Sequence, residues 1–147
     1  MALCKAFRRD QGGNSAVEFA LLVPLLLLLV SGLIDFGRAF FTGMELENSA
    51  RAGAQYAIVH GADNLTTIEN VVYGSSSVAP ADLTVNATTY CGCPDGTVQP
   101  CSGGDCGGFT PGTFVSIVAQ TSYTPIFPFH DADRPVTITG TARIRVE

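Results

Sequence analysis

The chain has 147 residues, enough for one domain of ordinary size. Of these, 46% are hydrophobic and 14% are charged, against about 25% charged residues in an average soluble domain, which argues against an intrinsically disordered chain. The formal net charge is −5, which argues against a basic surface that binds nucleic acid. The excess of apolar residues is concentrated near the N-terminus.

The first predicted element is an apolar helix. From Phe19 to Ile34 the sequence reads FALLVPLLLLLVSGLI and contains no charged residue. A helix of this length spans about 24 Å, somewhat less than the hydrocarbon core of about 30 Å. A helix in the core of a soluble domain would carry a polar face, which this segment lacks. The segment therefore predicts a single-pass membrane anchor, to which we assign residues 14–36.

The charges around this segment predict its orientation. Lys5, Arg8 and Arg9 precede it, so the positive-inside rule places the N-terminus in the cytoplasm and the rest of the chain outside. A cleaved secretory signal is the alternative, since basic residues precede the apolar run and a small residue, Gly32, lies near its end. Glu18 at the start of the run and the helical pattern that continues after it argue against that alternative.

Glu18 requires an explanation, because an unpaired carboxylate at the edge of a membrane span is costly unless it lies at the level of the lipid headgroups. Gly13 precedes it by five residues, and Phe19 follows it. A glycine, four residues and then Glu-Phe at the start of an apolar helix resemble a type IV prepilin processing site. The stretch AVEFALLVPLLLLLVSGLIDFGRAFFTGMELENSARAGAQYA resembles the TadE-like family of tight-adherence (Flp-type) pilus pseudopilins, over about residues 13–57.

The resemblance implies cleavage after Gly13 by a prepilin peptidase on the cytoplasmic side. Residues 1–13 would then be a leader, and Asn14 would become the new N-terminus. Glu18, followed by Phe19, would guide assembly by pairing with an Asn14 α-amine, in the same chain or in a neighbouring one.

The resemblance also implies a location and partners. The location is the bacterial inner membrane, with the head in the periplasm. The partners are the peptidase, other pilins and pseudopilins, the inner-membrane assembly platform and the lipid bilayer. The implied fold is pilin-like, with a long helix packed on an antiparallel sheet.

The helical pattern continues beyond the membrane and predicts one helix over 14–61, which ends at Gly61. Two stripes lie on this continuation. One consists of small side chains that we expect to pack onto the protein's own head, and the other consists of larger apolar side chains that are candidates for contacts between subunits. The small residues are Ala50, Gly53, Ala54 and Ala57, and the larger ones are Phe36, Phe40 and Met44.

Residues 62–147 predict an α+β head. A short helix capped by Asp63 or Asn64 should end at Gly74. Alternation of apolar and polar residues then predicts three strands, which are too closely spaced for crossover helices and therefore form an antiparallel sheet. The strands are 83–89, 113–123 and 134–146. Pro125 and Pro128 mark a loop between the last two.

Four of the five cysteines lie in a segment with almost no apolar residues, the Cys-rich loop 91–106, whereas Cys4 lies in the leader. An even number of cysteines outside the cytoplasm predicts two disulfides. Two pairings are open: Cys91 with Cys101 and Cys93 with Cys106, or Cys91 with Cys106 and Cys93 with Cys101. Zinc is the alternative, although the spacing C-x-C-x7-C-x4-C differs from the usual C-x2-C knuckles.

Other candidate metal ligands are weaker. Asp95 and Asp105 could bind calcium, but they lack the spacing of a calcium loop, so we expect solvated carboxylates. His130, with Asp131 and Asp133, is better interpreted as a polar turn. We therefore expect no metal and no cofactor.

The sequence contains no nucleophile elbow and no phosphate-binding loop, so we do not expect an enzyme, and a secreted enzyme with an uncleaved anchor is the least favoured reading. The favoured function is that of a minor pseudopilin involved in assembling the pilus. The alternative is a membrane-anchored binding or adhesion module, in which the Cys-rich loop with Phe109, or the loop around Pro128, contacts a partner.

Overall fold

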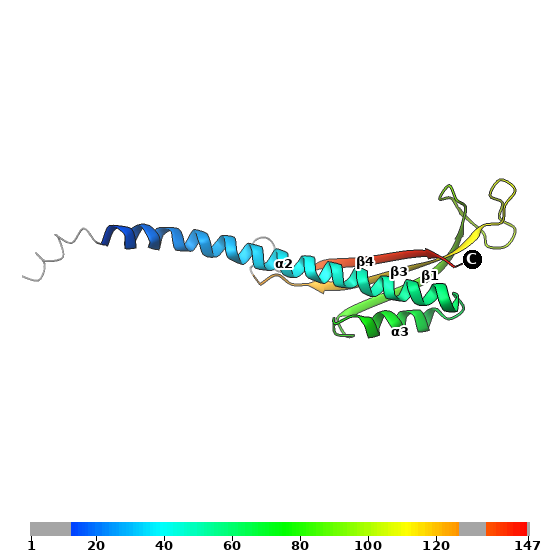
Figure 1. Ribbon diagram of the computed structural model, residues 1–147, viewed down its shortest axis with the longest axis horizontal. Coiled ribbons are helices and arrows are strands. Elements are labelled where there is room, and N and C mark those ends of the chain that lie inside the picture. Colours follow the sequence, from blue (N-terminus) through cyan, green and yellow to red (C-terminus); the bar gives the residue numbers. More distant parts are fainter. Residues whose placement is uncertain (1–12, 127–134, 147) are drawn as a thin grey trace, which may run out of the picture. The chain divides into compact units, whose positions relative to one another are not determined.

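The computed structural model describes residues 13–126 and 135–146. The leader residues, Pro128 and the turn around His130 lie outside the described residues. The elements are α2 (Asn14–His60), α3 (Leu65–Ser75), β1 (Leu83–Gly92), β2 (Val98–Gln99), β3 (Gly112–Tyr123) and β4 (Val136–Arg145). The predicted α+β class is confirmed (Figure 1). Contacts divide the chain into one unit that ends at Gly37 and a second that begins at Arg38. The second unit, which adds the C-terminal part of α2 to the predicted head, is called the head from here on.

Helix α2 confirms the predicted long N-terminal helix. It runs for 47 residues without interruption and includes Pro24. It ends at His60, whose Nδ1 lies 3.2 Å from the carbonyl oxygen of Tyr56. Gly61 follows with a φ of +75°, the left-handed conformation that commonly ends a helix and that glycine adopts without steric cost.

The head contains a four-stranded antiparallel sheet in the order β2-β1-β3-β4. The three predicted strands are present, and β1 continues three residues beyond its predicted end. The fourth strand, β2, was not predicted, because two residues are too few to show an alternation. It pairs with Cys91 and Gly92 at the end of β1.

One face of the sheet is covered by α3 and by the part of α2 that belongs to the head. Ala50, Ala54 and Ala57 of α2 are 0%, 7% and 0% exposed and lie in one core with residues of α3 and the sheet, which confirms the predicted packing of the small stripe. A Cβ at Gly53 would lie 2.5 Å from Val72 Cγ2 of α3 and 3.1 Å from Ile117 Cδ1 of β3. The short side chains therefore allow α2 to approach both neighbours closely.

Helix α3 also protects the outer edge of β1. It begins after Asn64, whose side chain accepts a hydrogen bond from the backbone N–H of Thr67 at 3.1 Å, so Asn64 is the predicted cap. The backbone N–H of Ala87 donates to Glu69 Oε1 at 2.9 Å, and that of Val85 donates to Tyr73 Oη at 3.4 Å. Side chains of α3 thus occupy hydrogen-bond donors that a neighbouring strand would otherwise pair with.

Glu45 connects α2 to the end of α3, which lies alongside it (Figure 1). Its Oε1 accepts hydrogen bonds from the hydroxyl and the backbone N–H of Ser77, and from the Ser76 hydroxyl at 3.5 Å. The Ser77 hydroxyl is the largest of the causes that lower the pKa of Glu45 below its ordinary value of 4.5. A carboxyl group whose pKa is lowered by folding stabilises the protein above its unfolded-state pKa and loses that contribution as the pH falls.

We therefore expect Glu45→Gln to reduce the stability of the head by about 1 kcal/mol at pH 7. The difference from the unsubstituted chain should shrink as the pH falls below about 4.5. Denaturant unfolding of the purified chain at pH 7 and at pH 3.5 measures both quantities. Glu47→Gln is the matched control, because Glu47 is exposed and its carboxylate forms an exposed ion pair with Arg51, at 2.6 Å. An effect of Glu45→Gln that does not change with pH would contradict the assignment.

Candidate functional site

The predicted processing site lies at the beginning of α2. Gly13 directly precedes the helix, and Asn14 is its first residue. Within the described part of the chain, and leaving out its two neighbours in sequence, no atom lies within 4 Å of a Cβ built at Gly13.

Glu18 and Phe19 follow within the first turns of α2. Both are exposed, and Phe19 retains 63% of its accessible surface. Within the described part of the chain, Glu18 forms no hydrogen bond or ion pair. Residues four apart lie on the same face of a helix, so positions 14 and 18 lie on the same face of α2.

The segment that follows is suited to a membrane. Among the described residues, one helix is long and apolar enough to cross a membrane by length and composition, over Ser15–His60. Its large side chains are mostly exposed, with Leu21 at 76% and Leu33 at 71%. These findings are consistent with a single-pass anchor, because in water such exposure would be costly.

The predicted stripe for subunit contacts is also exposed. Phe36, Phe40 and Met44 retain 70%, 60% and 44% of their accessible surface, and Phe41 retains 63%. Monomeric soluble domains rarely expose several large apolar side chains in succession.

The Cys-rich loop contains two disulfides. Cys91 is bonded to Cys101 and Cys93 to Cys106, with Cα atoms 5.1 and 5.4 Å apart. This is the first of the two pairings that the spacing left open. The two bridges overlap along the sequence, because Cys93 lies within the loop that Cys91 and Cys101 close. Each bridge therefore restrains part of the loop that the other closes. With the four sulfur atoms in disulfides, the structure does not have the thiolate set that the zinc alternative requires.

The carboxylates of the loop accept hydrogen bonds from residues of their own turns. Asp95 accepts hydrogen bonds from the backbone N–H and the hydroxyl of Thr97, at 3.0 and 2.7 Å. Asp105 accepts one from the backbone N–H of Gly108 at 2.7 Å. Over residues 13–126 and 135–146, no three His, Cys, Asp or Glu side chains lie close enough together to hold a metal ion.

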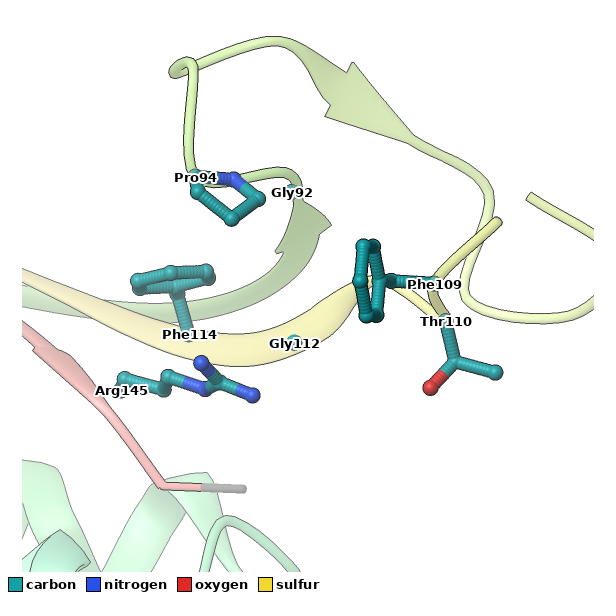
Figure 2. Close-up of a pocket in the computed structure, with 7 residues that line it drawn as sticks. All are labelled: Gly92, Pro94, Phe109, Thr110, Gly112, Phe114 and Arg145. Carbon is teal, nitrogen blue, oxygen red and sulfur yellow. The ribbon is translucent and has the colours of Figure 1, made fainter. Parts of the chain in front are cut away.

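A pocket of about 310 Å³ lies where this loop joins the sheet. Gly92 and Gly112 face each other there in the register of β1 and β3. Figure 2 shows Phe109 and Phe114 on opposite sides of these glycines, with the Arg145 guanidinium reaching toward Gly112. From the sequence, Phe109 alone is a candidate for binding here, because the other residues come together only through the pairing of β1, β3 and β4.

Comparison with known proteins bears on the N-terminal part of the chain. Residues 13–55 match the family model described as TadE-like protein. The predicted resemblance is therefore confirmed over residues 13–55, which include most of α2. No curated protein and no solved structure matches the chain.

Proposed function

We propose that this protein is a minor pseudopilin of a tight-adherence (Flp-type) pilus, anchored in the inner membrane by residues 14–36 and processed after Gly13. The match of residues 13–55 to TadE-like proteins suggests involvement in such a pilus. The observation that supports processing after Gly13 is that α2 begins at Asn14, the residue that cleavage would make the new N-terminus.

Cleavage would create a positively charged partner for the Glu18 carboxylate. It leaves a free α-amine on Asn14, one helical turn before the Glu18 carboxylate. Close to the bilayer a charge needs a partner, and an amine and a carboxylate satisfy each other, within one chain or between neighbouring chains. Pairing between chains would set their axial positions, because each apolar helix would be fixed relative to the next.

The exposed apolar side chains of α2 would add packing contacts to this ion pair. In the membrane they face lipid, and in an assembly they would face the helices of other pilins or pseudopilins. Helices in lipid associate through close packing and polar contacts rather than through the hydrophobic effect, so the Glu18 pair would provide specificity that leucine side chains do not.

The disulfides of the head support a location of this unit outside the cytoplasm. Disulfides persist in oxidising compartments such as the periplasm, and the two bridges lie in the part of the chain that the charge pattern places outside. The proposed partners are the prepilin peptidase, the inner-membrane assembly platform and other pilins. The proposed role requires no catalytic group.

The intact mass of the unreduced protein, extracted from membranes with and without the prepilin peptidase, tests this proposal. We expect a chain that begins at Asn14 only when the peptidase is present. Gly13→Leu should lower the processed fraction at least about tenfold and reduce the number of surface pili. Gly12→Leu is the matched control and should be processed. A chain that begins at Met1 in both strains would contradict the processing claim.

One observation favours the alternative of a membrane-anchored binding module. The pocket between Phe109 and Phe114 contains the features of a small-molecule site, with apolar walls and one oriented charged group. The two functions are compatible in one chain.

A further inference from the structure

The pocket lies at the end of the head opposite the point where α2 enters it. Arg38, the first residue of the head, lies 5.6 Å from the ring of Tyr123, at one end of β3. Gly112 is at the other end of this 12-residue strand, about 36 Å away at 3.3 Å per residue. Within the head, the pocket is therefore remote from the membrane-proximal end.

Two aromatic rings provide the apolar walls. Phe114 is stacked on Tyr90, with ring centroids 5.4 Å apart and an interplanar angle of 16°, so its position is fixed by β1 and β3. Phe109 is 74% exposed and stands at the mouth. Pro94 adds a third apolar surface.

Glycines at two positions of the lining leave room for the neighbouring groups of the pocket. A Cβ at Gly112 would lie 2.6 Å from Arg145 Nε, and one at Gly92 would lie 3.2 Å from the carbonyl oxygen of Thr97. The guanidinium therefore lies close against the backbone of Gly112 (Figure 2). Any larger residue at either position would displace a wall or fill the pocket.

The described residues that line the pocket carry a positive charge. Arg145 is the charged residue among them, and none of them is acidic. Arg143 lies two residues earlier on the same face of β4. Arg145 has a further interaction, and a guanidinium has five N–H donors, so it can hold a second group. An arginine beside aromatic rings favours an anion, and its planar fork of donors matches the two oxygen atoms of a carboxylate.

We propose that this pocket binds an acidic sugar residue, a pyranose ring that carries a carboxylate. The carboxylate pairs with Arg145, and the C–H face of the ring packs against Phe114 or Phe109. The volume of about 310 Å³ is at the lower end for small-molecule sites and corresponds to one ring. The proposal does not depend on processing or on pilus assembly.

The exposure of the pocket favours a sugar over an aromatic acid. Phe109, which lines the pocket, is itself largely exposed to solvent, so a ring bound against it keeps one side in water. A sugar has hydroxyl groups that remain hydrated on that side, whereas a wholly apolar ring would gain only half of its burial. A sugar residue within a polysaccharide could also continue out of the mouth.

Saturation-transfer NMR on the full chain in deuterated micelles tests the proposal, with glucuronate, glucose and benzoate as probes. We expect saturable binding of glucuronate and at least about tenfold weaker binding of glucose. Arg145→Gln should weaken glucuronate binding about tenfold or more, and Phe109→Ala should weaken it several-fold. Arg143→Gln is the matched control, since Arg143 shares the strand and the charge but does not line the pocket.

Three results would overturn the proposal: no saturable binding of glucuronate, equal binding of glucuronate and glucose, or an effect of Arg143→Gln as large as that of Arg145→Gln. Tighter binding of benzoate than of glucuronate would also overturn it and would assign the pocket to aromatic acids. The unreduced mass and the near-UV circular dichroism of each variant establish that the disulfides and the packing around tyrosines are intact.

Discussion

Replacing Gly140 by alanine is expected to destabilise the head by about 3 kcal/mol, the upper end of the usual cost of overpacking. Gly140 lies on the inner face of β4, directly against the backbone of Leu46 and Glu47 in α2. A single methyl group there would overlap atoms of the helix backbone, which cannot rotate away as a side chain can. Either α2 or β4 must move, and both are anchored by the core around Leu46.

Denaturant unfolding of the purified chain in micelles, followed by the near-UV signal of its tyrosines, measures this effect as a lower midpoint. Gly74→Ala is the matched control. Gly74 lies in α3, with nothing within 4 Å of an added Cβ, and alanine there should stabilise the helix by up to about 1 kcal/mol. Equal midpoints for the two variants would show that α2 does not contact β4 at Gly140.

The contact at Gly140 also marks the limit of what the sequence predicted. Alternation in the sequence puts Gly140 on the same face of its strand as Ile138 and Ala142, and the small stripe on α2 predicts that the helix packs closely. Both inferences use geometry that is local to one element. Which point of the helix meets which point of the strand depends on long-range packing, which no local pattern encodes.

The pocket could not be predicted from the sequence for the same reason. Tyr90, Phe114 and Arg145 lie far apart in the sequence and become neighbours only through the register of three strands. The disulfides were an intermediate case. Their number followed from the even count of cysteines, but the spacing allowed two pairings, and the choice required the positions of Cys91 and Cys93 at the end of β1.

The proposed processing site is a contrasting case. Gly13, Asn14, Glu18 and Phe19 form one continuous stretch, so the sequence alone brings them together. Their proposed partners are a peptidase and other subunits, which a single chain does not contain. The structure therefore adds two facts here: α2 begins at Asn14, and Glu18 has no hydrogen-bond or ion-pair partner within the described residues.

Removing the Cys93–Cys106 disulfide is expected to loosen the segment 94–109 while leaving the sheet folded. The bridge spans 13 residues, and in the chain-entropy model its loss costs about 3 kcal/mol. The segment has little burial to replace it, with Val98 and Phe109 being 69% and 74% exposed. Pro94 adjoins one cysteine, and the Phe109 carbonyl oxygen accepts a hydrogen bond from the Cys106 N–H at 3.0 Å.

Replacing both cysteines by serine tests this without leaving a free thiol. Limited proteolysis should cleave the segment 94–109 at least about tenfold faster than in the unsubstituted chain. Amide exchange should stay slow over Val115–Ala119, whose strand is paired on both sides. Cys4→Ser is the control and should change neither rate. Because the bridge anchors both Pro94 and Phe109, the same variant should also lose the pocket. Unchanged proteolysis would mean that the Cys91–Cys101 bridge alone holds the loop.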